Sequence, residues 1–301
     1  MMVVDDLPIN GWDKLSSGFS DLTAYHTTTW GKIVADSFGG TFRVLRVPSR
    51  GRHYVPILEG GTLARDGFVC GHIGYGGVFH EEHGMVLDLS TQLEVIQTVE
   101  NALGLPCLRF VTTPTSTRLL HASSFSTSVL TLPLTAQQLS ALYTSTVRNT
   151  IRKCERFGLE VRSVRPDEFD SCLELIHMTQ VRVNAGYLTP RTLLQGIFAA
   201  PEEFSFIIGS YKDGRLVAVG VFLRAARKVV YYLNGWSQAA AAFAPNYMML
   251  HGAFWACVEH GDISVDMGYS HSDTLLRSKI RWGATPAYFL KLKRECEGGL
   301  T

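Results

Sequence analysis

The sequence predicts an α+β fold made of two similar halves, and three observations lead to this. The expected elements repeat, since each half contains helical segments, strands, a further helix and further strands. Lys212-Asp213-Gly214 separates two apolar runs, which is a hairpin signal and indicates antiparallel neighbours. The chain has 301 residues with 46% hydrophobic content, enough core for one large or two ordinary domains. We therefore expect a first domain over residues 1–134 and a second over residues 135–301.

In the first half, the spacing of apolar residues predicts a helix from Thr28 to Phe38, which Gly39-Gly40 ends. A second helix is expected from Leu89 to Leu103, with Gly104 as its C-cap. The strands expected beside these helices are 42–47, 53–59, 67–73, 107–113 and 127–134.

A long helical arm, residues 135–158, is expected to link the halves, with a capping box formed by Thr135 and Gln138. In the second half, β-branched and aromatic runs predict strands, and apolar residues at four-residue spacing predict helices. The expected helices are 167–184, 192–198 and 248–261, and the expected strands are 204–211, 215–225, 228–237 and 263–268.

The helical arm carries a basic stripe, defined as Arg148, Arg152, Lys153 and Arg156, whose spacing places the four cations on one side of a helix. Such a charge run is either a solvated helix face or a stripe that contacts phosphates. The net charge is only +1 and the pI about 7.7, so no bulk charge indicates nucleic acid. A tRNA ligand would need a local patch of this kind.

The location of the protein is expected to be the cytoplasm. The first ten residues are acidic and lack the apolar segment of a signal peptide, and the most apolar passage is interrupted by Pro245, Asn246 and His251, so no membrane span is expected. Six cysteines occur without a C-x-x-C motif, which is typical of reduced thiols in a core.

A glycine-rich turn contains Gly71, Gly74 and Gly76, with Tyr75 inside it. No helix follows this string, so a dinucleotide-binding loop is excluded. Two interpretations remain open, a simple turn or backbone brought close to a substrate.

Several common chemistries are excluded by missing motifs. The sequence has neither G-x-S-x-G nor a P-loop, and the segment from His80 to His83 lacks the spacing of a zinc helix. We expect no metal and no cofactor.

Four segments follow one another in an order that resembles a known family: YYLNGWS, PNYMMLHGAFWAC, VDMGYS and LLRSKIRWGATP, between residues 231 and 286. This order is similar to the C-terminal half of the Fem family of aminoacyl-tRNA-dependent transferases, within the FemAB-like proteins of the GNAT superfamily. The resemblance implies two tandem GNAT-like subdomains, each with a mixed, mainly antiparallel sheet flanked by helices, and an acceptor cleft near their interface.

The resemblance also implies a reaction, in which an acceptor amine attacks the ester carbonyl of a charged tRNA and forms an amide. Lys279 matches the family lysine that faces this carbonyl, although an exposed loop lysine is the simpler alternative. Asp266 would orient Lys279 or the amine, or would only cap the loop that follows its strand. Ser278 stands where the family has Phe, so Trp282 is the candidate for stacking on the terminal base, with Arg277 and Arg281 holding phosphate.

Acceptor binding is implied for a second set of residues. Arg182 and Tyr187 match a family segment that binds the acceptor, and their alternatives are a helix-end Arg and a core-edge Tyr. The remaining candidates are Tyr75, Tyr232 and Asn246.

The donor is the point on which three hypotheses differ. A GNAT fold that uses CoA holds the pyrophosphate on a glycine-rich loop at a helix N-terminus, whereas residues 237–247 contain no glycine and one proline. The leading hypothesis is transfer from aminoacyl-tRNA to a small peptide, nucleoside-peptide or cell-wall precursor. The alternatives are an acyl-CoA-dependent N-acyltransferase and a non-catalytic tRNA-binding GNAT-like module.

Overall fold

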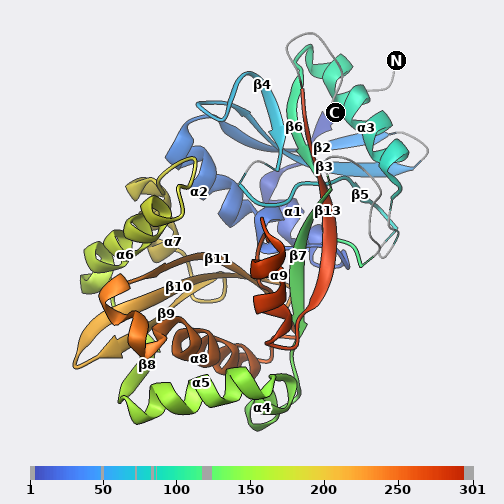
Figure 1. The fold of residues 1–301 in the computed structure, drawn as a ribbon. Helices are drawn as coiled ribbons and strands as arrows, with labels where there is room; N and C mark the ends of the chain where they lie inside the picture. The colour runs from blue at the N-terminus through green and yellow to red at the C-terminus, as the bar shows by residue number, and fades with distance from the viewer. Residues whose placement is uncertain are drawn as a thin grey trace. The chain divides into compact units, whose positions relative to one another are not determined.

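The computed structural model describes residues 4–48, 51–71, 73–82, 85, 87–116 and 124–294. Contacts divide the chain into two compact units (Figure 1). Unit 1 comprises Met1–Ser126 and Ala287–Thr301, and unit 2 comprises Thr127–Pro286. Two strands, β7 (Ser124–Thr131) and β13 (Thr285–Lys293), have residues in both units.

Unit 1 contains a mixed sheet in the order β1-β2-β3-β4-β6-β13, with β5 paired to β3. β4 and β6 are parallel, and the other neighbours are antiparallel. The core on one face is completed by a helix that contributes Val95, Ile96 and Val99. The elements are β1 (Asp5–Asp6), α1 (Ile9–Ser16), η1 (Ala24–His26), α2 (Thr28–Phe38), β2 (Thr41–Pro48), β3 (Arg52–Gly60), β4 (Ala64–Cys70), β5 (Phe79–His80), α3 (Leu89–Leu103) and β6 (Cys107–Val111).

Unit 2 contains a second mixed sheet in the order β7-β12-β11-β10-β9-β8, in which β11 and β12 are parallel and the other neighbours antiparallel. The elements are η2 (Ala136–Gln138), α4 (Leu139–Leu142), α5 (Ser145–Arg156), β8 (Leu159–Ser163), η3 (Pro166–Glu168), α6 (Phe169–Arg182), α7 (Arg191–Ala199), β9 (Ser205–Lys212), β10 (Arg215–Ala225), β11 (Lys228–Trp236), η4 (Gln238–Phe243), α8 (Pro245–His260), β12 (Ser264–Asp266) and α9 (Asp273–Ile280).

Helices cover both faces of the second sheet (Figure 1). α8 packs on one face with Met249, Ala253 and Phe254 in the core, and α5 lies beside α8. α6 packs on the other face, so closely that a Cβ at Gly235 of β11 would lie 2.4 Å from the backbone nitrogen of Ile176. Glycine is therefore required at this point of the strand. The predicted α+β class, with mixed and mainly antiparallel sheets flanked by helices, is confirmed.

The predicted long arm is wrong in one respect, because the helix is interrupted between α4 and α5. Tyr143 is extended and buries its ring, and Thr144 donates its backbone N–H to the carbonyl of Arg281, at 2.9 Å. These tertiary contacts override helix propensity at the two residues. The predicted capping box of Thr135 and Gln138 is confirmed.

None of the helices in the described ranges is long and apolar enough to cross a membrane. Five cysteines are buried free thiols, namely Cys70, Cys107, Cys154, Cys172 and Cys257. Cys296 and His83, which also entered the sequence predictions, lie outside the described residues.

Candidate functional site

The parallel pair of β11 and β12 is short, and its end positions the candidate site of unit 2. The register joins Val230 to Asp266, where β12 ends, while β11 continues to Trp236. A bulge interrupts the pairing of β11 with β10, because Tyr231 and Leu233 face consecutive residues of β10 and Tyr232 is the extra residue. Bulges bend a strand and re-aim side chains. Beyond Val230, β11 therefore runs on past the last residue of β12.

Asp266 holds the turn that follows β12. Its carboxylate is buried and accepts the backbone N–H of Gly268, at 2.8 Å, and it also contacts the hydroxyl of Thr127 on β7. The same hydroxyl lies 2.7 Å from the carbonyl oxygen of Gly268. The structure thus shows the capping role for Asp266, and Thr127 is a member of this network that sequence reasoning missed.

Lys279 is not an exposed loop lysine, because it lies in α9 and is only 7% exposed. Ser272 begins this helix by accepting the backbone N–H of Leu275. The ammonium nitrogen of Lys279 donates to the carbonyls of Gly268, at 2.5 Å, and Tyr269, at 2.9 Å. The Asp266 turn and the lysine therefore form one connected cluster.

Burial lowers the pKa of Lys279 from its ordinary value of 10.5 to about 8, although the charge of Asp266 raises it in part. Close to neutral pH the side chain therefore titrates between a cation and a neutral amine. Perturbed titratable groups of this kind concentrate at functional sites.

The two arginines beside Lys279 lie on another side of α9. Arg277 and Arg281 are four residues apart and exposed, whereas Lys279 points into unit 2. Arg277, Lys279 and Arg281 alternate along the sequence and would share one face of a strand. In a helix they do not share a face, so the two arginines are exposed while Lys279 is buried.

The prediction that Trp282 stacks on a tRNA base is wrong. Trp282 is 2% exposed and packs edge-on against Tyr143 and Phe254, with ring centroids at 5.0 and 5.5 Å. It also contacts Tyr247. The indole is a core side chain, since no face of it is open to a base.

Arg182 contacts Trp236, the last residue of β11. Its guanidinium lies 4.0 Å from the ring of Trp236 and donates to the carbonyl of Trp236 and to the hydroxyl of Thr179. The residue also lines an open groove along α6 together with His177 and Val181. Tyr187, in the loop after α6, is 53% exposed and does not line this groove.

Asn246 lies in the first turn of α8, and its side-chain oxygen is buried without a hydrogen-bond partner among the described residues. The turn itself is closed by internal bonds, from the N–H of Ala244 to Ala241 and from the N–H of Tyr247 to Ala244. Pro245 contributes no donor. The N–H groups of Ala244 and Tyr247 are therefore used inside the turn.

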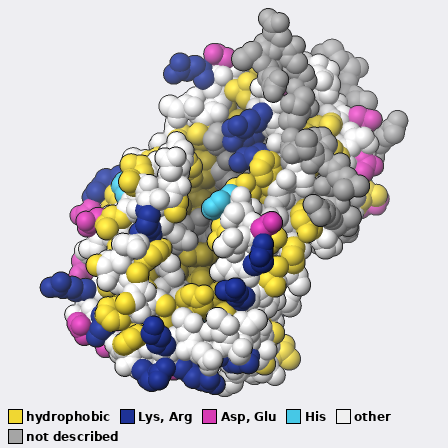
Figure 2. Space-filling model, viewed as in Figure 1, with side chains coloured by type: hydrophobic (Ala, Val, Ile, Leu, Met, Phe, Trp, Pro, Cys, Tyr) yellow, Lys and Arg dark blue, Asp and Glu magenta, His cyan; other side chains and the backbone are white. Residues whose placement is uncertain are grey.

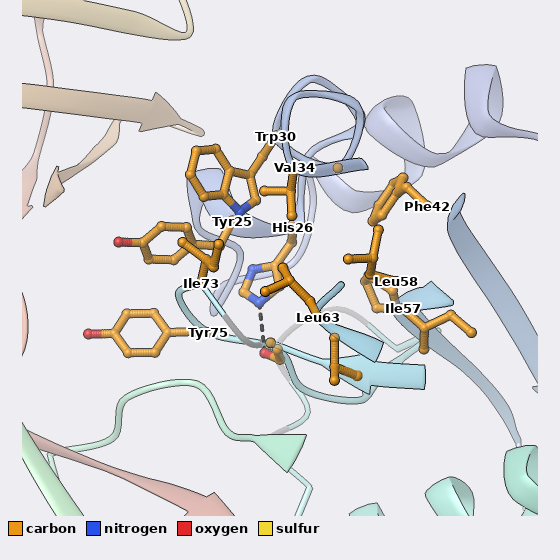
Figure 3. Close-up of a pocket in the computed structure, with 15 residues that line it drawn as sticks. Tyr25, His26, Trp30, Val34, Phe42, Ile57, Leu58, Leu63, Ile73 and Tyr75 are labelled. Carbon is orange, nitrogen blue, oxygen red and sulfur yellow. Dashed lines mark hydrogen bonds between the residues drawn. The ribbon is translucent and has the colours of Figure 1, made fainter. Parts of the chain in front are cut away.

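Tyr75 belongs to unit 1, where it is buried and packs edge-on against Tyr25 and Phe289. With Tyr25 and Trp30 it lines a cavity of about 50 Å³ (Figure 3). A dashed line in Figure 3 marks the bond that joins His26 to the carbonyl of Gly76, at 2.7 Å.

The glycine-rich turn is packed on itself, since a Cβ at Gly71 would lie 2.2 Å from the nitrogen of Gly76. This close packing of the backbone requires glycine at Gly71 and Gly76.

Three of the four cations of the basic stripe, Arg152, Lys153 and Arg156, are exposed, and Lys and Arg side chains gather over α5 in Figure 2. Arg148 differs, because its guanidinium donates to the carbonyls of Ser140 and Tyr143 and so caps α4.

Residues 143–274, all within unit 2, match the family model described as an acetyltransferase (GNAT) domain. Among solved structures, the chain is similar to FemX, with 13% identity, 96% of each chain covered and a TM-score of 0.68. No curated protein matches the sequence.

Two further structures share the fold. L-PGS from Bacillus licheniformis is 11% identical over 98% of this chain and 94% of that chain, with a TM-score of 0.55. A tandem GNAT protein from the clavulanic acid biosynthesis pathway is 10% identical over 99% and 100%, with a TM-score of 0.52. The chain therefore has a GNAT-type acyltransferase fold, and the predicted resemblance to FemX-like proteins is confirmed at the level of the fold.

Proposed function

We propose that the protein is an N-acyltransferase that moves an amino acid from aminoacyl-tRNA to the amine of a small peptide, nucleoside-peptide or cell-wall precursor. One observation carries this proposal, the buried Lys279 ammonium that the carbonyls of Gly268 and Tyr269 hold beside Asp266. The GNAT-type fold supports acyl transfer as the reaction class.

In the proposed reaction the acceptor amine attacks the ester carbonyl, and the ribose hydroxyl leaves. The ester is already activated, so the site has to position the amine and stabilise the oxyanion. An ammonium has three hydrogens, and the two carbonyl bonds of Lys279 use two of them. We assign the third to the developing oxyanion, with the Asp266 charge favouring the protonated lysine.

The choice of tRNA as donor rests on the resemblance to the Fem family and on the first turn of α8. The N–H groups of Ala244 and Tyr247 are used inside the turn and Pro245 has none, which is a poor cradle for the pyrophosphate of CoA. Arg277, Arg281 and the exposed part of the basic stripe are the groups we assign to tRNA phosphates. Arg182, Tyr187, Tyr232, Asn246 and Tyr75 stay proposals for the acceptor.

An acyl-CoA-dependent N-acyltransferase is the second candidate, because the family model that matches residues 143–274 is that of an acetyltransferase. A non-catalytic tRNA-binding module would keep the basic stripe and show no turnover with either donor.

The pH dependence of single-turnover transfer tests the role of Lys279. If the ammonium stabilises the oxyanion, the rate rises while the acceptor amine loses its proton and falls as pH passes about 8, the pKa of Lys279. Lys279→Arg should transfer more slowly but lose this falling limb, because a guanidinium stays charged throughout. Lys279→Met should lose about a hundred- to a thousandfold in rate.

If the wild-type pH profile has no falling limb, or if Lys279→Arg keeps the falling limb, then Lys279 does not take part in the reaction. Lys279→Met is preferred to Lys279→Ala because it fills the same buried volume.

A further inference from the structure

Thr127 lies on β7, beside the end of β12. These strands are antiparallel and place Asp266 directly opposite Val129, so the same register places Thr127 opposite Gly268. Residues that lie opposite one another, or two apart along a strand, are on the same side of a sheet. The Thr127 side chain is therefore on the side that carries Asp266, and it is 0% exposed.

The hydroxyl of Thr127 has one proton for two acceptors. Its oxygen lies 2.7 Å from the carbonyl oxygen of Gly268, and it also contacts the carboxylate of Asp266. A hydroxyl can donate one hydrogen, so a full hydrogen bond to one of these oxygens weakens the bond to the other. Because the side chain is buried, the proton is shared between these two oxygens and is not given to solvent.

Both acceptors also act on Lys279. The Gly268 carbonyl accepts the ammonium at 2.5 Å, and the charge of Asp266 raises the pKa of Lys279 against the effect of burial. A proton donated to the carboxylate offsets part of its charge, and a proton donated to the carbonyl occupies one of its two lone pairs. In either position the Thr127 proton weakens an interaction that favours the charged lysine.

Other titratable groups around Lys279 leave Asp266 as the charge that acts on it within the described part of the chain. Tyr269, whose carbonyl accepts the second bond of the ammonium, has a phenol whose pKa is raised by burial, so it is neutral near pH 8. The titratable side chains of α9 and of the turn before it are exposed, namely His271, Asp273, Arg277 and Arg281.

We propose that Thr127 is a positioning residue for acyl transfer, whose hydroxyl proton occupies the acceptors of Asp266 and Gly268 and so loosens their hold on the Lys279 ammonium. An ammonium that is held less firmly is a stronger donor to a developing oxyanion, because donor strength follows acidity. The role in transfer rests on the proposed function, whereas the effect on Lys279 is a property of the protein without substrate.

The test measures the pKa of Lys279 by NMR on the full chain labelled at lysine Cε, without substrate. The Lys279 signal is the one that Lys279→Met lacks. Thr127→Val removes the hydroxyl and keeps the shape, and Thr127→Ser keeps the hydroxyl. Thr112→Val is the matched control, because Thr112 is a buried threonine of unit 1 whose hydroxyl accepts the N–H of Leu290, at 3.0 Å.

We expect Thr127→Val to raise the pKa of Lys279 above its value of about 8, by roughly half a pH unit or more. Thr127→Ser and Thr112→Val should leave this pKa unchanged. If Thr127→Val does not fold, Thr127→Cys replaces it, since a thiol is a weak donor and should raise the pKa in the same direction.

The proposal is overturned if Thr127→Val leaves the pKa of Lys279 unchanged, or if Thr127→Ser raises it equally. It also fails if Thr127→Val returns the pKa to 10.5 and lets an amine reagent modify Lys279 as fast as exposed lysines, because Thr127 would then only hold the turn.

Single-turnover transfer separates this inference from the proposed function. The falling limb of the pH profile should move to higher pH in Thr127→Val by the same amount as the pKa of Lys279, and Thr127→Ser should restore it. A pKa that moves while the falling limb stays in place would refute the proposed function of Lys279 and still establish that Thr127 acts on this lysine.

Discussion

Lys279 shows that a run of charged residues in the sequence does not reveal which of them are buried, because this depends on the helix in which they lie. The resemblance to the Fem family implies a role for Lys279 beside Asp266, but the sequence does not indicate that Lys279 is buried, because burial depends on how α9 packs against the Gly268–Tyr269 turn. For the same reason Trp282 is predicted as a contact for a base and is found in the core. Residue type could be read from the sequence, whereas exposure required the tertiary contacts.

The stability of the protein should respond to pH through Lys279. Below about pH 8 the lysine is protonated in both folded and unfolded chains, and the cost of burying it is fully present. Between about pH 8 and its ordinary pKa of 10.5 only the unfolded chain holds the proton, so stability rises with pH.

Urea unfolding at about pH 7 and about pH 9.5 measures this effect, with Lys279→Met as the reference that cannot titrate. Relative to that variant, wild type should gain about 1–2 kcal/mol at the higher pH. A difference that stays constant with pH would mean that the pKa of Lys279 is not lowered.

Arg148 and Arg152 should differ although both belong to the basic stripe. Arg148→Ala removes the hydrogen bonds to the carbonyls of Ser140 and Tyr143 and should cost about 1–2 kcal/mol of unfolding free energy. Arg152→Ala changes an exposed side chain and should stay within about 0.5 kcal/mol. Equal effects in denaturant unfolding would contradict the capping role.

At the scale of elements, periodic segments could be predicted well. α2 and α3 begin and end at the predicted residues, because their caps are local signals. The break before α5 and the bulge at Tyr232 could not be predicted, since each depends on a partner distant in the chain. In the first case the partner is Arg281, and in the second it is β10.

The exposed part of the basic stripe on α5 should contact tRNA phosphates. Each phosphate contact contributes roughly 0.7–0.9 to the slope of log affinity against log salt, so Arg152→Ala/Arg156→Ala should weaken tRNA binding and reduce the slope by at most about two. Lys14→Ala/Lys32→Ala removes two exposed charges from α1 and α2 and is the control. If both double variants lower the slope equally, α5 is ordinary solvated surface.

At the scale of the whole molecule, composition and element order predict the α+β class, and the structure confirms it. They do not predict which strands become neighbours. The pairing of β13 with β6, and that of β12 with β7, joins segments far apart in the sequence. The candidate site depends on the second pairing, because it brings Thr127 beside Asp266.

The identity of the acyl donor is the central claim, and one measurement tests it most directly. Wild type and Lys279→Met are incubated with a pool of acceptors and either charged tRNA or a panel of acyl-CoA thioesters, and the products are weighed by mass spectrometry. We predict that wild type adds an aminoacyl mass from charged tRNA, that the acyl-CoA panel gives no product, and that Lys279→Met loses the aminoacyl product. Products formed from acyl-CoA alone would contradict the account and establish the acyl-CoA-dependent alternative.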